Sequence, residues 1–236
     1  MSVQRMKYCT EKTIENISEY LSAVRERGHV SLYRGQAEDW PLIPSIGRVN
    51  IALLNGLLEV EEDIVKQLKR YGYPYFKNDT SDETDWILHA QHFGLPTRLL
   101  DFTQNPLKAL YFSVENSTSE SDGVVWGLDD FYDSEPPILK DLDKVEFYTP
   151  SHINNRIIAQ ESVFAAFPLG RHDLEIIPLE KRHVDHRFFL KITIPSSYKP
   201  SIKEELGILG VNKMSIYPGI DGVVEKIKEE CGLNDK

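Results

Sequence analysis

The sequence predicts an α+β fold in which N-terminal helices pack on a mixed, mainly antiparallel sheet. Apolar residues recur at helical spacing mainly over residues 1–115, and most runs of strand length fall within residues 116–236. A length of 236 residues suits one large domain or two small ones, and no repeat or low-complexity linker divides the chain. We therefore expect a single domain over residues 1–236, helix-rich in 1–115 and strand-rich in 116–236.

Composition and charge exclude several classes of protein. The 27 basic and 37 acidic residues give a net charge of −10, which argues against nonspecific binding to nucleic acid or an anionic membrane but allows a local basic pocket. The sequence shows neither a signal peptide nor the roughly 20 apolar residues of a membrane span. Cys9 and Cys231 form no CxxC motif, and a disulfide between them is the less favoured alternative. We expect a cytoplasmic protein.

Helical spacing is clearest in the first half of the chain. Residues 13–27 place apolar side chains three or four residues apart before Gly28, and residues 51–70 and 83–93 repeat this pattern. A short strand is expected at 30–33, ending at Arg34.

A strand at 97–102 and a helix at 106–114 complete the predicted helix-rich half. Asn105 is a typical N-cap, and Pro106 suits the first helical position because its missing N–H would be unpaired there anyway. Further strands are predicted at 123–128, 145–148, 157–166, 187–194 and 213–217. Ser201 and Glu204 predict a capping box for a short helix that ends at Gly207, and a last helix is expected around 223–227.

Three polar clusters are candidates for chemistry. The first is 32–36, where Arg34 would present its planar guanidinium to a phosphate or carboxylate, and Gly35 would let a ligand or another backbone approach closely. The alternative is a surface arginine beside a turn glycine.

The second cluster, 89–106, contains several possible groupings. His89, His92 and Asp101 could form a metal site, but the HxxH motif lacks the glutamate that makes HExxH specific, so we expect no metal. Arg98 and Asp101 could instead pair within the fold. Thr103 precedes a capped helix whose N-terminus favours anions, and its hydroxyl could equally bond nearby backbone.

The third cluster is 154–164. In a strand, Gln160 and Ser162 would share one face and Glu161 would point to the other, or the strand would be an edge with one solvated face. The chain contains none of the motifs GxxxxGK[ST], GxGxxG and GxSxG.

Together these clusters resemble the FRG domain family, which is named after a Phe/Tyr-Arg-Gly signature. The resemblance covers residues 11–227 and implies a bacterial protein, with a link to stress or phage-defence effectors. The resembling residues are Tyr33-Arg34-Gly35-Gln36 with Trp40 and Pro44-Ser45, Ala90 to Asp101 with Asn105-Pro106 and Ala109 to Phe112, then Arg156, Gln160 and Phe164, and finally Gly210 to Gly222.

A second resemblance, to ADP-ribosyltransferases, follows the order of Arg34, Thr103 and the 160–164 segment. It implies an ADP-ribosyltransferase-like fold with NAD as substrate. Arg34 would hold an NAD phosphate, Thr103 would brace the nicotinamide pocket, and Gln160 or Glu161 would act in catalysis by stabilising an oxocarbenium-like transition state. The same resemblances give as further cofactor-binding candidates Gln36, Gln91, His92, Arg98 and Asp101.

Two main functions stay open. One is an enzyme that transfers ADP-ribose to a protein target or hydrolyses NAD. The other is a non-catalytic sensor or interaction module for a small-molecule nucleotide or another anion, which is favoured by Ser162 at the position where the transferase pattern has its glutamate.

Overall fold

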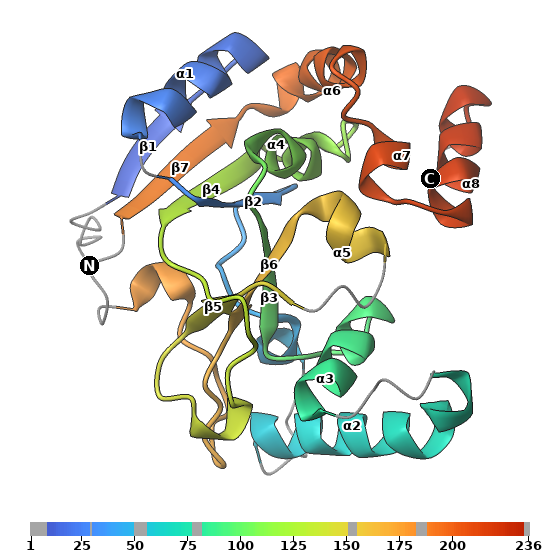
Figure 1. Ribbon diagram of the computed structural model, residues 1–236. Coiled ribbons are helices and arrows are strands. Elements are labelled where there is room, and N and C mark those ends of the chain that lie inside the picture. The colour runs from blue at the N-terminus through green and yellow to red at the C-terminus, as the bar shows by residue number, and fades with distance from the viewer. Residues whose placement is uncertain are drawn as a thin grey trace.

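The computed structural model describes residues 9–28, 30–49, 56–76, 82–150, 155–182 and 188–233. A seven-stranded sheet runs through its centre, in the order β1-β7-β4-β2-β3-β6-β5 (Figure 1). The strands are β1 Cys9–Thr13, β2 Leu32–Gln36, β3 Leu99–Thr103, β4 Gly123–Asp129, β5 Glu146–Tyr148, β6 Ser162–Ala166 and β7 Phe188–Ile194. The pair of β1 and β7 is parallel and all other neighbours are antiparallel, so the predicted mixed, mainly antiparallel sheet is confirmed.

Helices cover the sheet and complete an α+β single domain. In the described ranges they are α1 Ile17–Arg27, α2 Leu57–Gly72, α3 Glu83–His92, α4 Pro106–Val114, α5 Asn155–Gln160, α6 Lys199–Ile208, α7 Lys213–Ile216 and α8 Ile220–Glu230. Helices α1 to α4 lie in the predicted helix-rich half and α5 to α8 in the strand-rich half, so helices are spread over both. None of the helices in the described ranges is both long and apolar enough to span a bilayer.

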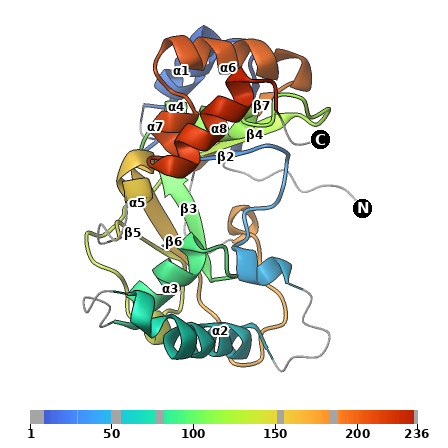
Figure 2. The ribbon, with the colours of Figure 1, turned by 90° about the vertical axis from the view of Figure 1, so that its right-hand side faces the viewer.

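The apolar faces of the helices divide one side of the sheet into two parts. Helices α1, α4 and α6 pack on β7, β4 and β2, whereas α2, α3 and α5 pack on β3, β6 and β5. These groups lie at opposite ends of the molecule, with α5 between α3 and α7 (Figures 1 and 2). The other side of the sheet packs against Leu57 at the start of α2 and against two segments that contain short 3₁₀ helices, Ser45–Arg48 and Leu179–Lys181.

Helix α4 touches the sheet backbone directly. A Cβ atom at Gly35 would lie 1.8 Å from the carbonyl oxygen of Ala109, and one at Gly123 would lie 2.3 Å from that of Ser113. No side chain fits at such distances, so the glycine of the Tyr-Arg-Gly motif serves the approach of a helix backbone.

Strands β2 and β3 separate soon after they meet. Their register within the described residues consists of the pair Tyr33–Thr103, whereas β2 and β4 pair along five residues from Leu32 to Gln36. The side chain of Arg34 reaches across this opening, where its Nη1 donates to the carbonyl oxygen of Asp101 at 2.8 Å.

Several predicted elements differ from the structure in type or in bounds. Residues 9–13, not predicted as a strand, form β1, and the helix predicted from residue 13 begins at Ile17. The predicted strand 157–166 is instead α5 followed by β6, and Glu161 between them has a left-handed φ of 48°. Such a residue ends a helix and changes chain direction.

Two predictions near the end of the chain also fail. The expected strand 213–217 is helix α7, where the Oδ1 of Asn212 accepts from two backbone N–H groups. The capping box of Ser201 and Glu204 is absent because α6 begins at Lys199, and the Ser201 hydroxyl donates to the carbonyl of Tyr198. The N-cap at Asn105 is confirmed. The 51–55 part of the predicted 51–70 helix lies outside the described residues.

Candidate functional site

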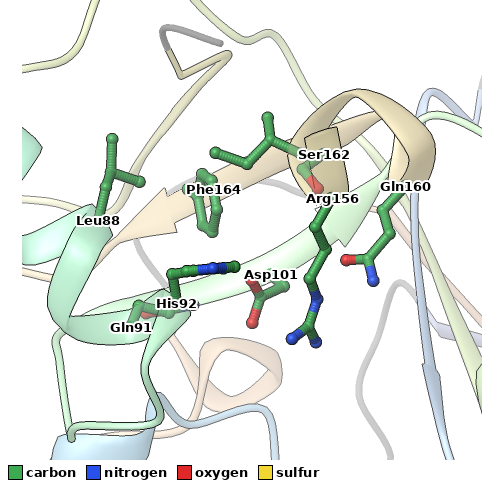
Figure 3. A pocket seen from close by; sticks show the side chains of 9 residues that line it. Leu88, Gln91, His92, Asp101, Arg156, Gln160, Ser162 and Phe164 are labelled. Carbon is green, nitrogen blue, oxygen red and sulfur yellow. The ribbon is translucent and has the colours of Figure 1, made fainter. Parts of the chain in front are cut away.

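A two-part hollow opens where β2 and β3 separate. The larger part has a volume of about 230 Å³ and the smaller about 80 Å³, and both are lined by Asp101, Arg156 and Gln160. The larger part is also lined by Tyr33, Arg34, Gly35, Phe102, Thr103, Phe112 and Tyr217. The smaller part, shown in Figure 3, adds Leu88, Gln91, His92, Ile157, Ser162 and Phe164.

Arg34 enters the larger part from β2 and is half-buried. Its Nε donates to Gln36 Oε1 at 3.1 Å, and Gln36 is held in turn because its Nε2 donates to the carbonyl of Trp40 at 2.6 Å. Burial lowers the pKa of the Arg34 guanidinium, which the charge of Asp101 opposes. Arginine stays protonated in proteins, so this partly desolvated cation favours an anion beside it. Gln36 is buried and positions Arg34.

Arg156 faces both parts of the hollow from α5 (Figure 3). Its guanidinium lies 5.2 Å from the ring centre of Tyr217, and within the described ranges its side chain has no hydrogen bond or ion pair. We had not predicted Arg156 as a binding residue. Arg156 and Gln160 are four residues apart, so a helix over 155–160 places both on one face, a signal that the predicted strand concealed.

Asp101 lies between His92 and Arg156 in Figure 3. It is exposed on β3, and its carboxylate lacks both a hydrogen bond and an ion pair to any described residue. His92 is exposed at the last turn of α3. Gln91, one residue earlier, is oriented by the Thr97 hydroxyl, which donates to its Oε1.

Arg98, another cofactor-binding candidate, lies outside the hollow. Its Nε donates to Glu61 Oε2 and its backbone N–H to Glu61 Oε1 at 2.7 Å, while its Nη1 donates to the carbonyl of Leu139 at 3.1 Å. Both partners are buried, with exposures of 4% and 2%. The alternative pairing with Asp101 was therefore wrong, because the buried partner of Arg98 comes from α2 instead.

Thr103 is buried and uses its hydroxyl within the framework. The Oγ1 donates to the carbonyl of Gln160 at 2.7 Å and accepts from Asn105 N at 3.0 Å, which matches the backbone-bonding alternative. The nearby N-terminus of α4 is capped, since Asn105 Oδ1 accepts from Leu107 N and Lys108 N. Thr103 thus lines the hollow and positions Gln160.

The two catalytic candidates differ in placement. Gln160 lines both parts of the hollow, and its Nε2 donates to the carbonyl of Ile216 at 3.3 Å. Glu161 is not among the lining residues: its Oε1 accepts from Lys108 Nζ at 2.6 Å and from Asn105 Nδ2 at 3.1 Å. Partial burial would raise the pKa of Glu161, but the bonds from Lys108 and Asn105 outweigh it and lower that pKa.

The alternative of a metal site formed by His89, His92 and Asp101 does not assemble in the described part of the chain. No group of three or more histidine, cysteine or acidic side chains there could hold a metal ion. The His89 ring lies 4.4 Å from the ring of Phe76 and packs near Trp86, away from Asp101.

Comparison with known protein families gives a match over one segment of the chain. The FRG domain model matches residues 29–122, which include Arg34, Asp101 and Thr103 but end before Arg156 and Gln160. Neither the curated proteins nor the solved structures gave a match. The hollow therefore combines residues of the matched segment with residues from later in the chain, and the protein contains an FRG domain over residues 29–122.

Proposed function

We propose that the protein binds NAD, or a closely related nucleotide, in the two-part hollow. The observation that carries this proposal is the convergence of two guanidinium groups, Arg34 and Arg156, on one hollow in a chain of net charge −10. Guanidinium groups bind phosphate oxygens in bidentate geometry, so two of them suit a diphosphate. A local cationic site in an acidic protein is also selective, because the remaining surface repels anions.

The walls of the larger part support a ligand that carries rings as well as phosphates. Tyr33, Phe112 and Tyr217 are aromatic and line the same space as Arg34. Aromatic side chains contribute stacking and edge contacts to planar rings. A volume of about 230 Å³ is just below the usual range for ligand pockets, so we expect the hollow to hold part of a dinucleotide and leave the rest at the surface.

The position of the Glu161 carboxylate favours binding without turnover. A carboxylate that stabilises an oxocarbenium ion must reach the sugar, and Glu161 is held against α4 by Lys108 and Asn105. Ser162 occupies the neighbouring place on the wall.

NAD cleavage or ADP-ribosyl transfer is the second candidate, favoured by a specific observation. The carboxylate of Asp101 lines both parts of the hollow beside Gln160. Nicotinamide release from NAD, measured with and without cell lysate, separates the two candidates.

Titration calorimetry with NAD tests the binding proposal. We expect Arg156→Ala to weaken binding about tenfold or more, since one charge-assisted phosphate contact contributes about 1.5–3 kcal/mol. Its melting temperature should stay near that of the wild type, because Arg156 is exposed. Arg171→Ala, an exposed arginine outside the hollow, is the matched control. Absence of NAD binding at millimolar concentrations, or equal affinity in Arg156→Ala, would contradict the proposal.

A further inference from the structure

We infer that Asp101 makes the hollow selective for a dinucleotide whose ring is positively charged, so that NAD⁺ binds more tightly than NADH. This inference rests on the proposed function and deepens it, because it names the redox form of the ligand and the residue that recognises it.

The two parts of the hollow differ in charge. Asp101 and Arg156 line both parts, but Arg34 lines only the larger one. The larger part therefore has two guanidinium groups against one carboxylate, and the smaller part has one of each beside the apolar groups Leu88 and Phe164. A ligand that spans both parts is complementary when its anionic groups lie beside the two guanidinium groups of the larger part and a cationic group lies against the Asp101 carboxylate in the smaller part. NAD⁺ has this pattern, with a diphosphate and a pyridinium ring, whereas the dihydropyridine ring of NADH is neutral.

Asp101 is free to recognise such a ring. Its side chain lies in the hollow between His92 and Arg156 (Figure 3), with no ion pair to any described residue within 4.0 Å. The Arg34 guanidinium binds the carbonyl oxygen of Asp101 at 2.8 Å and leaves its carboxylate available. The same residue therefore fixes one arginine through its backbone and places its negative charge where the two parts of the hollow meet.

The contacts around the carboxylate favour a flat ring over a compact cation. Phe164 is the cross-strand neighbour of Asp101, and its ring lines the smaller part together with Leu88 on α3. These apolar groups give a planar ligand a surface to contact, and Asp101 lies at the edge of that surface (Figure 3). A cationic ring gains both apolar contact and charge attraction there, and a neutral ring gains only the first.

The test compares NAD⁺ and NADH by titration calorimetry on the full chain, for the wild type, Asp101→Asn and Asp129→Asn. Asp101→Asn keeps the side-chain shape and removes the charge. Asp129→Asn makes the same change in net charge at an exposed position at the end of β4, outside the hollow. It therefore controls for long-range electrostatic effects.

We expect the wild type and Asp129→Asn to bind NAD⁺ about tenfold more tightly than NADH, because an opposite charge a few ångströms away is worth about one tenfold step in affinity at a partly exposed site. Asp101→Asn should lose this preference by weakening NAD⁺ binding while the affinity for NADH stays within about twofold. Equal affinity for both forms in the wild type, or an unchanged preference in Asp101→Asn, overturns the inference and leaves the proposed function intact. If neither dinucleotide binds the wild type, the proposed function fails and the inference fails with it.

Discussion

At the scale of single residues, Gly35 shows how close packing dictates a residue type. A methyl group there would overlap the carbonyl oxygen of Ala109, so Gly35→Ala must push α4 away from β2. We expect a loss of about 3 kcal/mol or more in the free energy of unfolding, measured with urea.

Gly207→Ala is the matched control, since a Cβ at this position in α6 meets no atom within 4 Å. It should raise stability by up to about 1 kcal/mol. Equal stability of Gly35→Ala and the wild type would show that α4 does not rest on β2 as described.

The role of a residue was predictable where its interaction partners lie within the same short sequence motif. Asn105 and Pro106 are typical of the N-cap and the first position of a helix, and α4 begins at Pro106. The partners of Arg98 and Glu161 were not predictable, because buried ion pairs and side-chain bonds join residues far apart in the sequence. Arg98 pairs with Glu61, one of several acids on α2, and only the packing of α2 on α3 selects it.

At the scale of elements, the ion pair of Glu61 and Arg98 joins α2 to the start of β3. Burial raises the pKa of Glu61, and the charge and hydrogen bonds of Arg98 oppose that rise. Glu61→Gln should cost about 3–5 kcal/mol of unfolding free energy, because it leaves a buried guanidinium without its counter-charge.

The exposed neighbour Glu62→Gln provides the control and should change stability by less than about 0.5 kcal/mol. Equal urea midpoints for the two variants would contradict a structural role for the pair.

Helix and strand types followed from the sequence where periodicity extends over several turns, as in α1 to α4. They failed for α5 and α7, which are six and four residues long and contain β-branched residues that also suit strands. Tertiary contacts decide such short segments: Gln160 is fixed by the carbonyl of Ile216, and that bond links α5 to α7. Strand β1 escaped prediction because its pattern is mostly polar and its pairing partner lies at the other end of the chain.

At the scale of the whole molecule, the two halves of the sequence interleave in one sheet. Strands β2 and β3, from before residue 115, lie between β4 and β6 from after it, and β1 pairs with β7, so both halves of the sequence contribute strands along the whole sheet. We expect one cooperative unfolding transition in urea. Far-UV circular dichroism and tryptophan fluorescence should give the same midpoint, since Trp86 in α3 and Trp126 in β4 report on both halves.

Two resolved transitions, or midpoints that differ between the two probes, would contradict this single unit. The α+β class was predictable from composition and periodicity, whereas the strand order was not, because it depends on pairings between distant segments.

The pairing of Cys9 with Phe189 has a consequence for biosynthesis. Strand β7 leaves the ribosome long after β1, so the sheet cannot close while most of the chain is still being translated. Until then β1 and the edge of β4 that pairs with β7 present unpaired backbone groups, which are sites of wrong pairing with other chains. Because these pairings join segments far apart in the sequence, we expect folding to be slower than that of a helical bundle of similar size.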